Sequence, residues 1–150
     1  MTNQAIARGL LAILCSLQGL ATDAIDLNRT HATNPEWPGH ARFHLVWQVV
    51  TVALLALLEV VLILSPGPLQ AQRFYVAAIL AAIPMLGFFA ASVGKGLYRG
   101  ASSDPDEKRP TMIVLPGSNL YVELNLLAEA AGVLALGVIV ALYSYVSAAR

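Results

Sequence analysis

The three histidines of this chain, His31, His40 and His44, lie within one short segment. His40 and His44 are four residues apart, so on a helix they share one face. Such a pair can chelate a divalent transition metal, and His31 with Asp26 or Asp23 could complete the coordination. The same imidazoles could instead move protons near neutral pH at the mouth of an apolar pocket. A third interpretation is that they anchor a loop at a membrane surface through hydrogen bonds.

Three carboxylates, Glu59, Glu123 and Glu129, lie within segments that are otherwise almost free of charge. A lipid-facing ionised group in a bilayer costs at least about 2.5 kcal/mol, so these side chains should face the interior of a bundle. Asn119 precedes Glu123 by four residues, and Asn125 precedes Glu129 in the same way, which places each pair on one helical face. Interhelical hydrogen bonds are the structural explanation. The functional explanation adds Glu123 and Glu129 to the histidine pair as acid–base candidates.

Prolines restrict the segment that carries the histidines. Pro35 and Pro38 favour extended geometry in the residues before them, and Pro38 also suits the first turn of a helix. Arg42 then lies among the histidines, where a fixed cation could hold an anionic head group. Trp37 and Trp47 suit the aromatic belt of a membrane interface. The side chains that we expect to contact a ligand are Asp26, Asn28, His31, Trp37, Arg42, Trp47, Gln48, Asn119 and Asn125.

The elements that must position these residues follow from the hydrophobicity. The chain is 57% apolar and 12% charged, and its nine basic residues balance nine acidic ones, which gives no field to attract nucleic acid. A bilayer core of about 30 Å requires about 20 mostly apolar residues in a helix. Four such segments are present, at about 5–22, 39–64, 72–93 and 118–147. The sequence therefore predicts an all-α integral membrane four-helix bundle, one domain over residues 1–150.

The segments between the helices predict the topology. Residues 65–68 read Ser-Pro-Gly-Pro, which cannot continue a helix and should form a tight turn. Residues 9–22 could alternatively be a signal peptide, but we expect a retained helix because Met1 begins the chain. The loops at 23–40 and 94–116 carry more Lys and Arg than the opposite end, so the positive-inside rule places them in the cytoplasm.

Residues 31–44 also carry a resemblance. The pattern His31-x-x-Asn34-Pro35-x-Trp37-Pro38-x-His40-Ala41-Arg42-Phe43-His44 resembles the signature of a group of small four-helix bacterial and fungal membrane proteins of unknown function. Elsewhere the resemblance covers only the hydrophobic layout. That layout is also similar to the DoxX-like proteins and to the sterol-isomerase and sigma-2-receptor group, whose four-helix bundles enclose a lipid-like ligand beside buried acids. The resemblance implies a four-helix bundle and permits a lipid-sized pocket.

The function that we expect is binding of a hydrophobic small molecule, such as a quinone, sterol, terpenoid or lipid, in a pocket at the polar end. The histidines and Glu123 or Glu129 would hold its head group or move its protons, and whether a reaction follows stays open. One alternative is a non-catalytic accessory subunit, whose intramembrane acids pair with helices of a membrane-protein partner or of a second copy. The other is a metal-binding membrane protein that uses His31, His40 and His44.

Overall fold

The structure, a computed structural model, describes residues 2–102, 112–114, 117 and 121–148. Its helices are α1 (Asn3–Asp26), α2 (Gly39–Leu64), α3 (Gln70–Gly94) and α4 (Leu124–Ala148). Each is long and apolar enough to cross a membrane. The predicted all-α four-helix bundle is therefore confirmed, and α2 has the bounds that the sequence predicts.

The beginning of the last helix differs from the prediction. Strands β1 (Met112–Val114) and β2 (Tyr121–Glu123) pair antiparallel, with Ile113 opposite Val122, and α4 begins only at Leu124. Gly117, between the strands, has a positive φ of 78° that glycine adopts without strain. Because Glu123 ends a strand, it does not share a helical face with Asn119, and Asn119 itself lies outside the described residues.

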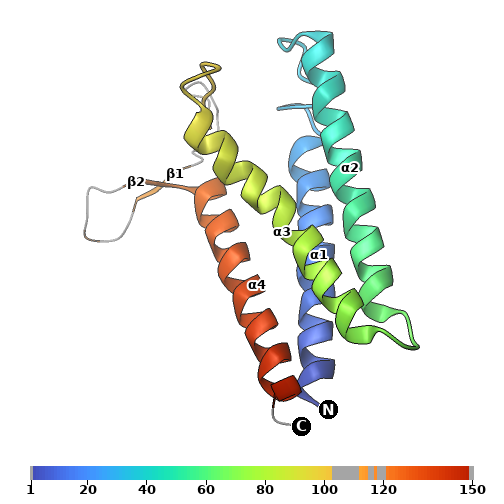
Figure 1. Cartoon of the computed structure of the whole chain (residues 1–150). Helices are drawn as coiled ribbons and strands as arrows, with labels where there is room; N and C mark the ends of the chain where they lie inside the picture. The colour runs from blue at the N-terminus through green and yellow to red at the C-terminus, as the bar shows by residue number, and fades with distance from the viewer. Residues whose placement is uncertain (1, 103–111, 115–116, 118–120, 149–150) are drawn as a thin grey trace.

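Figure 1 shows both termini at one end of the bundle, together with the connection between α2 and α3. Gly67 and Leu69 in this connection have positive φ values of 104° and 64°. The Arg73 guanidinium donates to the carbonyl oxygens of Pro66 and Gly67, which ties the turn to the first turn of α3. The connection from α1 to α2 and the end of α3 lie at the opposite end of the bundle, which we call the polar end (Figure 1).

The buried core lies in the half of the bundle near the termini. Helix α1 packs most extensively on α2 and then on α4, and α3 crosses the bundle to contact both α2 and α4. On α1 the residues Ala7, Leu11 and Cys15, spaced by four, form one buried stripe. The ring of Phe74 on α3 stacks on Tyr143 of α4, with the centroids 3.8 Å apart. The remaining members of this core are Ile63, Ala77, Ala78, Ala81, Leu136 and Ile139.

The arrangement of the ends can be tested by labelling. Pro68 and Glu36 are both exposed and lie in connections at opposite ends of the bundle. We expect Pro68→Cys and Glu36→Cys to react with a membrane-impermeant maleimide from opposite faces of uniformly oriented vesicles. The unaltered protein is the control, because its Cys15 is fully buried and should stay unlabelled. Labelling of both positions from the same face would contradict the four-span topology.

Candidate functional site

His40 and His44 lie in the first turns of α2, directly after the extended Pro38. Their Nε2 atoms are 3.0 Å apart, so the ring N–H of one imidazole donates to the ring nitrogen of the other. His44 also stacks on the indole of Trp47, with the ring centroids 5.8 Å apart. The predicted face shared by the two histidines is present, and both side chains are exposed, as is Gln48 one turn further.

His31 lies in the loop and has different neighbours. Its Nδ1 is 2.7 Å from Thr30 Oγ1, and its ring meets the edge of Trp37 with the centroids 5.4 Å apart. Among the described residues no three His, Cys, Asp or Glu side chains form a group that could hold a metal ion. The structure therefore does not bring His31, His40 and His44 together as the predicted three-ligand set. The histidine pair alone supplies only two of the four ligands that a structural zinc site uses.

The polar side chains of the loop mainly stabilise the loop itself. The Oδ1 atom of Asn28 accepts two hydrogen bonds from Thr30, one from its backbone N–H at 2.8 Å and one from its hydroxyl group at 2.6 Å. The Nδ2 group of Asn28 donates to the carbonyl oxygen of Ile25. Asn34 Oδ1 accepts from the Glu36 backbone N–H at 3.0 Å. Such bonds to neighbouring backbone groups are how asparagine holds turns. Asp26 and Arg42 are half-buried at the ends of α1 and α2 that flank this loop.

The predicted acids of the C-terminal region lie at the polar end. Glu129 is half-buried, whereas Asn125, one turn earlier on α4, is exposed. A Cβ atom built on Gly132 would lie 3.1 Å from Met85 Cε, so this part of α4 faces α3. Glu129 precedes Gly132 by three residues and therefore lies on nearly the same face of α4. Glu123 is half-buried at the end of β2, and its Oε1 has no hydrogen-bond partner within the described part of the chain.

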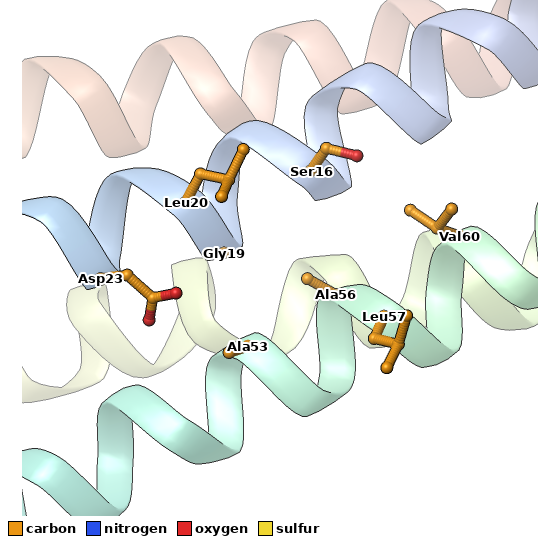
Figure 2. A pocket seen from close by; sticks show the side chains of 8 residues that line it. All are labelled: Ser16, Gly19, Leu20, Asp23, Ala53, Ala56, Leu57 and Val60. Atoms are coloured by element: carbon orange, nitrogen blue, oxygen red, sulfur yellow. The ribbon is translucent and has the colours of Figure 1, made fainter.

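A groove of about 270 Å³ lies between α1 and α2 (Figure 2). The two helices approach closely because Gly19 has no side chain. A Cβ atom at Gly19 would be only 2.9 Å from Ala56 Cβ and 3.8 Å from Ala53 Cα. Glycine and alanine at a helix contact allow such an approach in a membrane. The groove is lined by Ser16, Gly19, Leu20, Asp23, Ala53, Ala56, Leu57 and Val60.

Asp23 supplies the single charged side chain of this lining. Figure 2 shows its carboxylate directed into the space between α1 and α2. The side chain is half-buried, and none of the hydrogen bonds or ion pairs found among the described residues involves its carboxylate. The sequence pattern indicates Asp23 only as an alternative to Asp26 in a metal site. The small residues at Gly19, Ala53 and Ala56 were the signal that could have pointed to the groove.

Glu59 is the one charged residue that the described part of the structure buries completely, with 1% of its surface exposed. Its carboxyl group lies close to the thiol of Cys15, which is fully buried on α1. The second carboxyl oxygen, Oε2, has no hydrogen-bond partner among the described residues. The expectation that this acid faces the bundle interior is confirmed. Its position beside Cys15 depends on the packing of α1 against α2, which local sequence does not show.

Comparison with known proteins adds no relative, because no family model, no curated protein and no solved structure matches the chain. The resemblance of residues 31–44 to a membrane-protein signature stays a prediction.

Proposed function

We propose that this protein binds a hydrophobic small molecule, of the quinone, sterol, terpenoid or lipid kind, in the groove between α1 and α2. The observation that carries the proposal is the groove itself, whose lining is apolar or small except for Ser16 and Asp23. Leu20 and Leu57 in this lining are 66% and 61% exposed, so the groove lies on a surface that would face lipid. A ligand would enter it sideways from the bilayer.

The size of the groove limits what it can hold. Pockets that enclose a drug-sized ligand usually measure about 300–1,000 Å³, and this groove measures about 270 Å³. The space therefore suits one hydrocarbon chain or one edge of a ring system. Because lipid tails are as apolar as the groove, selectivity must come from shape and from the polar head of the ligand. Asp23 is the group placed to recognise that head.

Binding, rather than a reaction, is the role that we assign to the groove. His40, His44, Glu123 and Glu129 are not part of its lining. The histidine pair is exposed in the first turns of α2, which begins at the polar end (Figure 1). Acid–base chemistry by these four residues would require a substrate that extends out of the groove to reach them.

Blocking the groove tests the proposal. Ala53 is half-buried and lines the groove, so Ala53→Phe should fill it and remove the small molecule that co-purifies in mild detergent, detected by native mass spectrometry. Leu54→Phe is the matched control, because Leu54 is the next residue, is 61% exposed and does not line the groove. Equal retention by both variants would contradict the proposed site.

A second candidate is an accessory subunit of a larger membrane complex. Helix α4 is the least buried of the four described spans, and its half-buried Glu129 has no hydrogen-bond or ion-pair partner among the described residues. A partner helix could cover this surface and hydrogen-bond to the acid. The same mass spectra discriminate the two candidates, since a stoichiometric protein in place of a small molecule would favour the subunit.

A further inference from the structure

We infer that the ligand of the α1–α2 groove is a long-chain amine, whose cationic head group pairs with the Asp23 carboxylate. This inference rests on the proposed function and names the chemical class of its ligand. Three observations support it: the carboxylate of Asp23 is unpaired among the described residues, Asp23 lies in the last turn of α1, and it lies at one end of the groove.

The first observation is the state of the acid. Asp23 is half-buried and directed into the groove, with no partner for its carboxylate among the described residues. The basic side chains with described hydrogen bonds are used elsewhere. Arg8 donates to the Ile63 carbonyl oxygen, and Arg73 holds the turn between α2 and α3. A partly desolvated carboxylate without a counter-ion favours a ligand that brings a cation.

The second observation is the position of Asp23 in the last turn of α1, where the chain has no basic residue. The C-terminal end of a helix carries a partial negative charge from its unpaired carbonyl groups. Here Asp23 and Asp26 add two carboxylates to that end. A cation in the groove would compensate the helix end and the acid together, whereas a phosphate or carboxylate head would be repelled by both.

The third observation is the position of Asp23 along the groove. Asp23 lies three residues before the end of α1, so it is roughly 4.5 Å from the helix end at 1.5 Å per residue. Ser16 and Val60 line the other end of the groove, seven residues from Asp23 and Ala53 along their helices. The apolar part thus extends roughly 10 Å deeper into the span. Asp23 thus lies at one end of the groove and the apolar lining extends from it, an order that matches a single-chain amphiphile with its charged head at Asp23.

Two photoreactive probes of equal chain length, a hexadecylamine and a hexadecanol, test the inference on the full chain in phosphatidylcholine nanodiscs. We expect the amine to label the segments that line the groove at concentrations about tenfold lower than the alcohol, because both head groups can donate a hydrogen bond to the carboxylate but only the ammonium adds a charge–charge attraction. Asp23→Asn should remove this preference and leave alcohol labelling unchanged. Glu36→Gln is the control, because it removes one exposed acid of the neighbouring loop and should keep the preference.

The outcomes separate this inference from the proposed function. Equal labelling by both probes in the unaltered protein, or an amine preference that survives Asp23→Asn, would overturn the amine assignment while the groove stays a lipid site. Labelling that Ala53→Phe does not reduce would overturn both. Asp23→Glu provides a second variant, and it should retain part of the preference because it keeps the charge at a shifted position.

Discussion

Gly19→Ala should destabilise the protein by about 1–3 kcal/mol, the usual cost of forcing an extra group into a packed contact. The added Cβ would lie 2.9 Å from Ala56 Cβ, whereas two carbon atoms in favourable contact are about 3.5–4.0 Å apart. Neither atom belongs to a flexible side chain, so α1 and α2 would have to separate. Because the groove is lined by both helices at this contact, ligand retention should fall as well. Thermal unfolding in detergent measures the first effect, and native mass spectrometry the second.

A compensating change makes the experiment specific. Ala56→Gly removes the atom that the new methyl group would meet, so the double variant Gly19→Ala with Ala56→Gly should recover most of the lost stability. Such non-additivity is expected of residues in direct contact. Gly9→Ala on the same helix is the control, because a Cβ there would have no neighbour within 4 Å. If the double variant loses as much stability as the two single variants together, the contact between residues 19 and 56 does not determine the distance between α1 and α2.

Much of this fold was predictable because backbone polar groups in lipid must be satisfied within a helix. That constraint makes the length of each apolar segment decisive, and Gly39–Leu64 was predicted without error. It does not apply outside the apolar segments. Residues 112–114 and 121–123 pair as strands, so the last helix begins six residues later than the predicted position 118. Pairing between separate segments depends on contacts that local sequence does not show.

The parts of the candidate site that depend on residue spacing within one helix could be predicted from the sequence. The parts that depend on how each helix is rotated toward its neighbour could not. His40 and His44 lie on one face because their separation is close to one helical turn. The groove depends on which faces of α1 and α2 meet. An apolar stripe reveals the buried face of a helix in water, but a helix that is hydrophobic all round carries no such stripe. Small residues such as Gly19 and Ala56 indicate in the sequence that a close helix contact is possible, but only the packing shows that these two meet each other.

The largest gain in stability should come from Glu59→Met. A buried polar group without a partner costs about 1–3 kcal/mol, and Oε2 of Glu59 is such a group among the described residues. Methionine has a similar length and adapts to irregular space, so it should fill the site without the unpaired oxygen. We expect a rise in the melting temperature in detergent. Glu59→Gln should gain less, because its amide group also needs partners, and Glu59→Lys should prevent stable folding because it buries an uncompensated cation.

Ile63→Met tests whether methionine alone has this effect. Ile63 is equally buried, one turn from Glu59 on the same face of α2, and a swap of similar volume there should be neutral or cost less than about 1.5 kcal/mol. If Glu59→Met instead lowers the melting temperature by more than this control, the carboxyl group stabilises the fold through a partner such as bound water. If Glu59→Met is more stable, the acid is retained at a cost to stability. A residue of that kind is expected where function requires it, because natural proteins commonly give up stability at functional sites.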